Sequence, residues 1–396
     1  MRKALALLAI GLAAPLAACG SGSSGTPATS VDVRTLEVGS YKTTPITIPA
    51  PTLQRARLAE GQQLASTVPL PMDIDPRFEY EFGNGPDQLY GFTQKAKATG
   101  LFVDDLDAQT PGFIAGLNVA AHSNPDTEIS IQLFYSVLIF DSPANATAAA
   151  KILGDNQFSH TPGAQRIGID GHPETQAFWQ PGTDSQQSFT ASSTYVLYTE
   201  VLDQAMVEVG MSDAGELTDV TGKVIRAVPP ALANFHPTPI DRLTTIRIDR
   251  DGMIARSLFA PGGTDDSNPA TVYDRHGSLL LSEDPGADRD LYTRTGMDLM
   301  AINAGRLYRT RDAENARYLA DVRSTIHRLH RVAEPPANLP SAHCDETGSA
   351  TAMVTIGNPP RFHCVVAYDR YVAEVWSDQI VDAHQRISAQ YALLTR

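Results

Sequence analysis

The sequence predicts an α+β protein with two tandem related domains, each an antiparallel sheet with helices packed on one face. Three observations support this class. Strand-like runs alternate apolar and polar residues, which is typical of antiparallel sheets. Helical patterns with three- and four-residue spacing separate these runs. The order strand, helix, two strands, helix occurs twice along the 396 residues, which indicates an internal duplication.

The first copy begins with an apolar run at residues 133–140, and Pro143 then marks the first turn of an Ala-rich helix. Strand-like runs follow at residues 195–198 and 207–209. Ser212 stands where a helix N-cap is expected. The helix after it has apolar residues every three or four positions, namely Leu217, Val220, Val224 and Val228.

The second copy repeats this plan with a strand at residues 306–310 and Asp312 as a helix cap. The helix is expected to run far enough to carry Leu319, Val322, Ile326 and Leu329 on one apolar stripe. Two strands follow at residues 364–367 and 373–375, and Ser377 is the expected cap of the last helix. The apolar positions of that helix are Ile380, Ala383, Ile387 and Leu394.

A Glu-Val pair followed by Ser-Asp supports the duplication, because Glu208-Val209 and Glu374-Val375 stand at matching places. Prolines cluster between the copies at residues 229–239, which favours a boundary there. A weak helix is predicted at residues 53–67. The predicted domains are residues 31–235 and 236–396.

The N-terminus has the order of an export signal. Arg2 and Lys3 precede an apolar run at residues 4–14. Leu16-Ala17-Ala18-Cys19 resembles the lipobox of bacterial prolipoproteins. The resemblance implies that residues 1–18 are removed and that lipid on Cys19 anchors the chain to the extracytoplasmic face of the cell membrane. An ordinary secretory signal is the alternative. The Gly- and Ser-rich residues 19–30 are expected to be a flexible tether.

The acidic composition limits the partners. A formal net charge of −14 disfavours nucleic acid, whose phosphates require clusters of Lys and Arg. It also disfavours electrostatic adsorption to anionic lipid. The sequence therefore predicts a membrane contact through the lipid anchor and no nucleic-acid partner. A small-molecule, lipid or envelope-protein partner stays open.

Cys344 and Cys364 remain as a pair once Cys19 carries lipid, and a disulfide between them fits an oxidising compartment. Each follows a histidine, His343 and His363, so a Cys2His2 metal site is the alternative. Neighbouring side chains of a strand point to opposite faces, which separates His363 from Cys364. The disulfide is therefore favoured, and no metal site or cofactor is predicted.

Catalytic motifs are incomplete. Ser212 lacks the second glycine of a nucleophile elbow. His327 and His330, expected in a helix, lack the glutamate of a zinc-protease motif. Residues 249–252 fit a hairpin turn better than a calcium loop. No catalytic residue is predicted. His172, in a Gly-His-Pro turn, is the first residue to examine for binding.

The segment from Gln62 to Pro76, with Pro69-Leu70-Pro71-Met72-Asp73, resembles one found in actinobacterial tandem-domain lipoproteins of unknown function. That resemblance implies a lipobox, two related α+β halves and a C-terminal disulfide, and it supplies no catalytic residues. The sequence thus predicts a membrane-anchored binding or interaction protein of the cell envelope. A cell-envelope hydrolase whose acid and base lie far apart in the sequence is the alternative.

Overall fold

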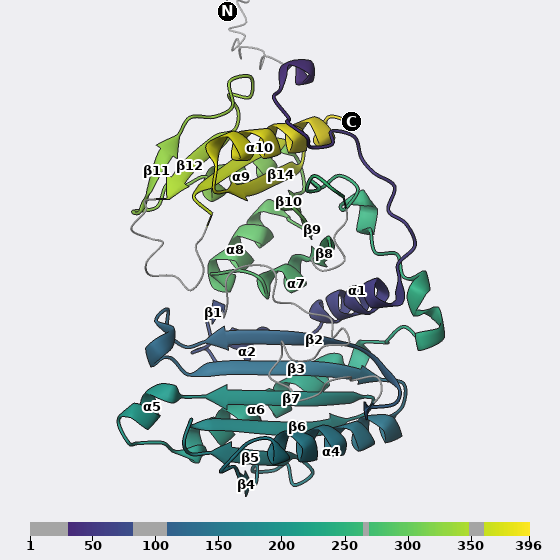
Figure 1. Cartoon of the computed structure of the whole chain (residues 1–396), viewed down its shortest axis with the longest axis vertical. Helices are drawn as coiled ribbons and strands as arrows, with labels where there is room; N and C mark the ends of the chain where they lie inside the picture. Colours follow the sequence, from purple (N-terminus) through teal and green to yellow (C-terminus); the bar gives the residue numbers. More distant parts are fainter. Residues whose placement is uncertain (1–30, 82–108, 264–268, 348–359) are drawn as a thin grey trace, which may run out of the picture.

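A computed structural model describes residues 31–81, 109–263, 269–347 and 360–396 (Figure 1). The predicted signal, Cys19 and the tether lie outside these ranges. The described chain contains two seven-stranded sheets in which all strand pairs are antiparallel. Among the described helices, none has both the length and the apolar character needed to cross a membrane.

The first sheet has the strand order β1-β2-β3-β7-β6-β5-β4. Its long central strands are rich in β-branched and aromatic residues, which pack well on a pleated surface. The strands are β1 (Tyr80–Glu81), β2 (Phe113–His122), β3 (Gln132–Phe140), β4 (Gln165–Ile167), β5 (Gln176–Gln180), β6 (Ser185–Ser192) and β7 (Tyr195–Leu202).

The second sheet has the order β8-β9-β10-β14-β13-β12-β11, which is the same order strand for strand. Two sheets with one topology, arranged in tandem, are the expected product of a duplication, so the internal repeat predicted from the sequence is present in the fold. The strands are β8 (Thr271–Asp274), β9 (Leu299–Ile302), β10 (Arg306–Arg309), β11 (His330–Ala333), β12 (His343–Thr347), β13 (Phe362–Tyr368) and β14 (Tyr371–Ser377).

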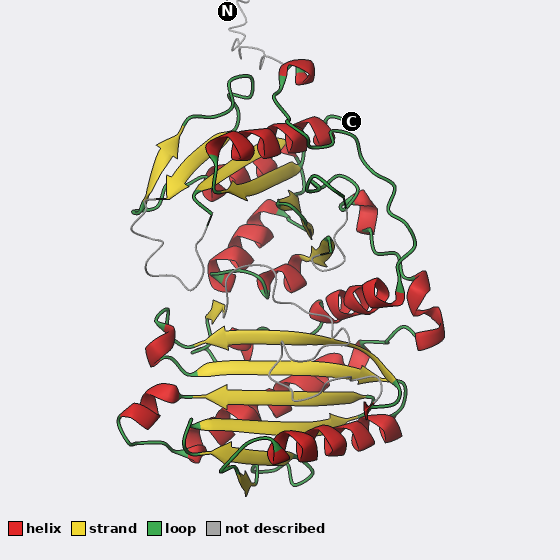
Figure 2. Cartoon of the chain, viewed as in Figure 1, coloured by secondary structure: helices red, strands yellow, loops and turns green. Residues whose placement is uncertain are grey.

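Each sheet carries a helix on each face (Figure 2). In the first sheet α4 (Pro143–Ser159) and α6 (Ala214–Ala231) pack against alternate residues of β3 and β7, which point to opposite faces. In the second sheet α9 (Ala313–Arg323) and α10 (Ile380–Leu394) do the same. The α+β class and the tandem domains are confirmed. The prediction of helices on one face was too narrow, because the central strands bury both sides.

Turns and caps align the two copies residue by residue. Two-residue turns join β6 to β7 and β13 to β14, and Ser193 and Asp369 hold the same turn position with φ of 52° and 48°. Ser142 and Asp312 both cap the helix that follows the third strand, as the sequence predicted for Asp312. These landmarks define the equivalent positions used below.

Helix α1 (Leu53–Ala65) lies between the two halves (Figure 1). It contacts β2 of the first sheet and α7 (Arg275–Leu279) and β8 of the second. One apolar core joins side chains of both halves, for example Leu117 and Tyr308. The remaining short helices are α2 (Pro71–Ile74), α5 (Gln204–Glu208), α8 (Pro285–Thr295), η1 (Val33–Thr35), η4 (Thr127–Ile129), η5 (Leu232–Asn234), η6 (Ile240–Thr245) and η7 (Arg250–Gly252).

The start of the described chain packs on the second sheet although it precedes the first. Leu36 and Tyr41 belong to the core beneath α10, and the Tyr41 hydroxyl donates to Asp382 Oδ1 at 2.7 Å. Residues 31–48 therefore pack against the C-terminal half before the chain enters α1. The domain boundary near residue 235 stays a prediction.

Three sequence predictions about the first copy and the linker were wrong. Residues 207–209 are not a strand, because β7 ends at Leu202 and α5 follows it, so Glu374 matches Tyr198 rather than Glu208. Asp213, not Ser212, caps α6 by accepting the Gly215 N–H at 2.9 Å. Residues 249–252 form no hairpin, since the Asp249 carboxylate folds the chain by accepting the N–H groups of Ile254 and Ala255.

The predicted apolar stripe after Asp312 was also wrong in its second half. Helix α9 ends at Arg323, where the Ser324 N–H caps the last carbonyls. Ile326 and Leu329 lie beyond it with 41% and 57% of their surface exposed. The chain has to leave the helix here because β11 pairs with β12. At the second expected cap, Ser377 lies two residues before the Gln379 N-cap of α10 and accepts the N–H of Gln379.

Candidate functional site

The candidate site lies on the α9 face of the second sheet, where the covering helix is short. Helix α4 has 17 residues and α9 has 11. At 1.5 Å per residue, six fewer residues shorten the helix by about 9 Å. In the first half Gln157 of α4 donates to Gln187 of β6 at 2.9 Å. Counted from the caps, the residue equivalent to Gln157 is His327, which lies beyond the end of α9. Among the described residues α9 therefore does not reach this end of the second sheet, which we call its uncovered end.

Charged and polar side chains occupy the equivalent positions of the second sheet. In the first sheet the α4 face holds an aromatic cluster that includes Phe178, Phe189 and Tyr198. The ladder registers pair Phe178 with Gln187 in one sheet and Asp345 with His363 in the other. At equivalent positions, the residue of the first half is replaced by a different residue in the second half. The pairs, first half before second, are Ser136 and Arg306, Leu138 and Tyr308, Leu153 and Arg323, Phe178 and Asp345, Gln187 and His363, Tyr198 and Glu374, and Glu200 and Trp376.

His363 bridges two buried carboxylates. Its Nδ1 lies 3.0 Å from Asp345 Oδ2, and its Nε2 lies 3.3 Å from Glu374 Oε1. The other oxygen of Asp345 lies 2.6 Å from Nδ1 of His330. Burial alone would lower the pKa of His363, but the hydrogen bonds and charges of Asp345 and Glu374 outweigh it and raise the pKa to about 9. His363 is therefore an imidazolium at neutral pH.

Glu374 is a carboxylate held inside the sheet, with 3% of its surface exposed. Burial would raise the pKa of Glu374, but the hydrogen bond from His363 and the charges of Arg323 and Arg306 lower it to about 2. Its second oxygen accepts a hydrogen bond from the Tyr308 hydroxyl at 2.6 Å. The buried charge is thus ionised and fully hydrogen-bonded, as burial requires.

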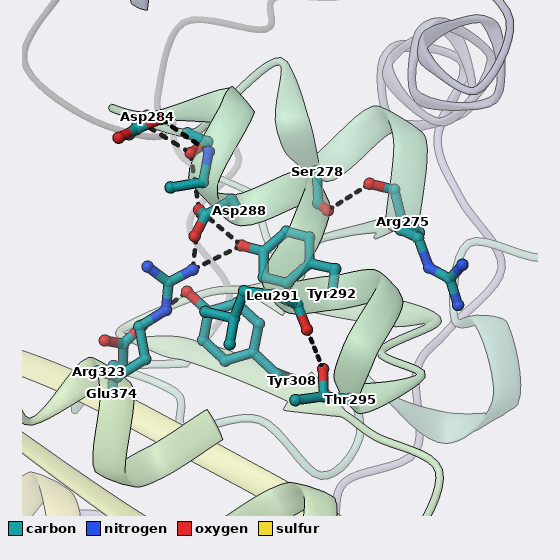
Figure 3. A network of polar contacts seen from close by, with 12 residues as sticks. Arg275, Ser278, Asp284, Asp288, Leu291, Tyr292, Thr295, Tyr308, Arg323 and Glu374 are labelled. Carbon is teal, nitrogen blue, oxygen red and sulfur yellow. Dashed lines mark hydrogen bonds and ion pairs between the residues drawn. The ribbon is translucent and has the colours of Figure 1, made fainter. Parts of the chain in front are cut away.

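Arg323, the last residue of α9, links the sheet to α8 (Figure 3). Its Nη2 donates to Asp288 Oδ2 at 2.9 Å and to the Tyr292 hydroxyl at 2.8 Å. The same carboxylate oxygen accepts from Tyr292 at 3.1 Å and from Ser282 at 2.7 Å. The guanidinium also lies near the rings of Tyr292 and Tyr308, 5.6 and 5.5 Å from their centroids.

Trp376 lies between two cations of the same face. The His363 ring stacks on it with centroids 5.0 Å apart and an interplanar angle of 18°. The guanidinium carbon of Arg306 lies 5.3 Å from the Trp376 ring centroid. His363 comes from β13 and Arg306 from β10, the two neighbours of β14 in the sheet.

The arrangement is poorly suited to general-base catalysis by His363. A general base needs a free nitrogen and a pKa near the working pH. Both nitrogens of His363 are engaged by carboxylates, and its raised pKa keeps it protonated. The residues described around it offer no hydroxyl or thiol nucleophile hydrogen-bonded to His363. What the site presents is a group of fixed charges next to a partly exposed indole.

The structure joins Cys344 and Cys364 by a disulfide, as the sequence predicted. They are directly opposite on β12 and β13 with Cα atoms 4.1 Å apart. The disulfide lies in the core under α10, whereas His363 points to the α9 face. The Cys2His2 alternative fails because these groups do not share a face, and the described residues contain no cluster suited to a metal ion.

The histidines singled out in the sequence separate in the structure. His172 lies 3.5 Å from Glu174 in the first half, away from the site. His327 and His330 are not in a helix, and only His330, on β11, joins the site through Asp345. Sequence reasoning missed Arg306, Tyr308, Arg323 and Asp345. One signal was present in Glu374, a charged residue inside the otherwise apolar run Val372–Val375.

Comparisons with known proteins give a family and a distant structural likeness. Two family models match in tandem, "Domain of unknown function (DUF7373) N-terminal" over residues 47–248 and its C-terminal counterpart over residues 253–396. No curated protein sequence matches the chain. A solved structure, the extracellular domain of PknH from Mycobacterium tuberculosis, aligns with 46% of this chain and 97% of its own, with 12% identity and a TM-score of 0.29.

Proposed function

The chain belongs to the DUF7373 family, and from that premise we propose that it is a lipid-anchored extracytoplasmic protein that binds a ligand. The binding site in this proposal is the uncovered end of the second sheet. We define this surface by Arg306, His330, His363 and Trp376, with Glu374 and Asp345 beneath them.

The anchor rests on the lipobox-like Leu16-Ala17-Ala18-Cys19 that follows a basic and apolar leader. The Cys344–Cys364 disulfide fits the same location, because structural disulfides persist in oxidising compartments outside the cytoplasm. Two or more acyl chains on one cysteine would hold the protein stably at the membrane surface.

One observation carries the binding role. The second sheet keeps the topology of the first but places paired charges and a half-buried indole where its shorter helix leaves the face uncovered. An apolar face, like that of the first sheet beneath α4, would be the simpler way to stabilise the second sheet, since buried ion pairs add little net stability. Convergent charges at an open position are instead typical of binding sites. Hydrolysis with His363 as the general base is disfavoured, because its raised pKa keeps it protonated at neutral pH.

The anchor is tested by mass spectrometry of the N-terminal peptide from protein extracted from its native membrane. We expect a diacylglyceryl adduct on Cys19 and no residues 1–18. The Cys19→Ser variant should lack the lipid. An unmodified Cys19 in the mature wild-type protein, or cleavage elsewhere, would contradict the anchor.

The binding role is tested by native mass spectrometry of the same extracted protein. We expect a bound species beyond the Cys19 adduct in wild type, and its loss in His363→Gln, which installs the residue of the first sheet. His160→Gln, which removes an exposed histidine at the end of α4, is the matched control and should retain the species. A wild-type protein without any bound species would contradict the binding role.

A further inference from the structure

Arg306 is held in one orientation at the open end of the second sheet. Its guanidinium lies over Trp376, and the indole is fixed in turn by the stacked ring of His363. His363 cannot swing away, because Asp345 and Glu374 hold both of its nitrogens. A guanidinium fixed against an aromatic ring presents its N–H donors at its edge. The donors of Arg306 are thus preorganised by the packing around them.

The carboxylates near Arg306 are engaged by other residues. Glu374 stands directly opposite Arg306 in the β10–β14 ladder, but its two oxygens accept from Tyr308 and His363. Asp288 pairs with Arg323, and Asp345 pairs with the two histidines. The charge of Glu374 raises the pKa of Arg306, but no ion pair joins the two side chains in the described part of the chain.

Arg306 hydrogen-bonds with the Tyr308 side chain but keeps an unused donor. Within the described ranges its buried Nε has no hydrogen-bond partner. Residues 348–359, which join β12 to β13 in the sequence, contain no Asp or Glu. A buried donor without a partner is unfavourable, so a ligand that supplies an acceptor would be favoured here.

We propose that Arg306 binds an oxyanion of the ligand, a carboxylate or a phosphate group, at the uncovered end of the second sheet. This inference rests on the proposed binding function and names the chemistry of the ligand. A planar guanidinium matches both oxyanions with two parallel N–H···O bonds. A cationic ligand would meet Arg306 and the His363 imidazolium. A sugar would have to stack on a face of the Trp376 ring, but the His363 ring and the Arg306 guanidinium already lie against that ring.

The first half contains a matched arginine whose charge is satisfied. The guanidinium of Arg166 lies 4.3 Å from the Phe158 ring centroid and donates to Asp155 Oδ1 at 2.9 Å. It combines an aromatic contact with a carboxylate partner, so it has no need of an external oxyanion. Arg166→Gln is therefore the control for any general effect of removing a ring-stacked arginine.

The test is a fluorescence titration of the full mature chain. Trp179 and Trp376 are its two tryptophans, and Trp179→Phe leaves Trp376 as the single reporter at the site. The probes are sodium phosphate and sodium acetate, with sodium chloride at equal ionic strength as the reference. We expect a saturable change with phosphate or acetate, and the stronger of the two identifies the oxyanion. Arg306→Gln should weaken the apparent affinity at least tenfold, and Arg166→Gln should leave it unchanged.

Arg306→Lys keeps the charge but loses the planar fork, so it should also weaken binding, and it decides the question if Arg306→Gln does not fold. A titration that is unchanged in these variants, or no saturable response to either anion, would overturn the inference. The native mass spectrum separates this failure from that of the proposed function. A bound ligand without an oxyanion contradicts only the role of Arg306, whereas no bound ligand contradicts the binding role itself.

Discussion

The two sheets share one strand order but use the same face in different ways. Beneath α4 the first sheet packs aromatic rings, with Phe189 and Tyr198 4.9 Å apart between centroids. A carboxylate on that face, Glu200, accepts from neutral donors of Tyr198, Gln187 and Ser185. Beneath α9 the second sheet holds two carboxylates paired with His363, and Asp288 of α8 pairs with Arg323.

The difference shows that topology and the chemistry of a face can diverge independently after duplication. An aromatic face stabilises by removing apolar area from water and needs a long helix to cover it. A face of paired charges depends less on a covering helix, because its carboxylates are hydrogen-bonded by neighbouring side chains. The copy with the shorter helix is the one that carries the charges, which places the candidate site in the second half.

The largest expected effect is on Glu374. Glu374→Gln removes the charge that compensates His363, Arg323 and Arg306, and breaking a buried ion pair from one side costs about 3–5 kcal/mol of unfolding free energy. Urea denaturation measures the loss. At the equivalent position of the first sheet, Tyr198→Phe removes one hydrogen bond and should cost about 1 kcal/mol. Equal losses in the two variants would remove the contrast between the sheets.

The disulfide gives the next effect, since the first sheet has Ala177 and Ser188 at the equivalent pair. The double variant Cys344→Ala with Cys364→Ala opens a loop of sequence separation 20 and should lower the unfolding free energy by about 3 kcal/mol. Denaturation with and without dithiothreitol measures this effect. The reductant should destabilise wild type by a similar amount and leave the variant unchanged. If it destabilises both equally, the disulfide is not the cause.

The pH dependence of stability should come from the second sheet. The pKa of His363 is raised from 6.5 to about 9, so its contribution is complete below about pH 6.5 and is lost as the pH rises through 9. The pKa of Glu374 is lowered from 4.5 to about 2, so its contribution is present above pH 4.5 and is lost as the pH falls towards 2. We expect a plateau between these values and an alkaline loss on the order of 2–3 kcal/mol.

Thermal unfolding from pH 3 to pH 10 records this profile. In His363→Gln the alkaline decrease between pH 6.5 and 9 should flatten, because no imidazolium is left to titrate. In the His160→Gln control it should persist. A decrease of unchanged size in His363→Gln would assign the pH dependence to another group.

The smallest expected effect is on the helix N-caps, a feature that both copies have kept. Ser142 accepts the N–H of Asn145 at 3.3 Å, and Asp312 accepts that of Asn315 at 2.9 Å, as the caps of α4 and α9. Ser142→Ala and Asp312→Ala should each cost about 1 kcal/mol in urea denaturation, because an N-cap acts locally. A loss at Asp312 several times that at Ser142 would mean that the cap also positions Arg323 at the other end of α9.

Much of the fold could be predicted from local patterns. Helices α6 and α10 follow from their three- and four-residue apolar spacing, and the starts of α4 and α9 follow from Pro143 and Asp312. The end of α9 could not be predicted in this way. Leu319, Val322, Ile326 and Leu329 keep helical spacing, but pairing of β11 with β12 ends the helix at Arg323.

The sequence by itself determined the two-copy α+β plan, the pairing of Cys344 with Cys364 and the expectation of an export signal ending at Cys19. These depend on periodicity, residue chemistry and neighbours along the chain. The tertiary structure alone decided the site. Arg306, Arg323, Asp345 and Glu374 come from different strands and helices, and only the antiparallel register sets His363 between two carboxylates. Charges far apart in sequence acquire a common electrostatic role when folding places them within a few ångströms in a medium of low dielectric constant.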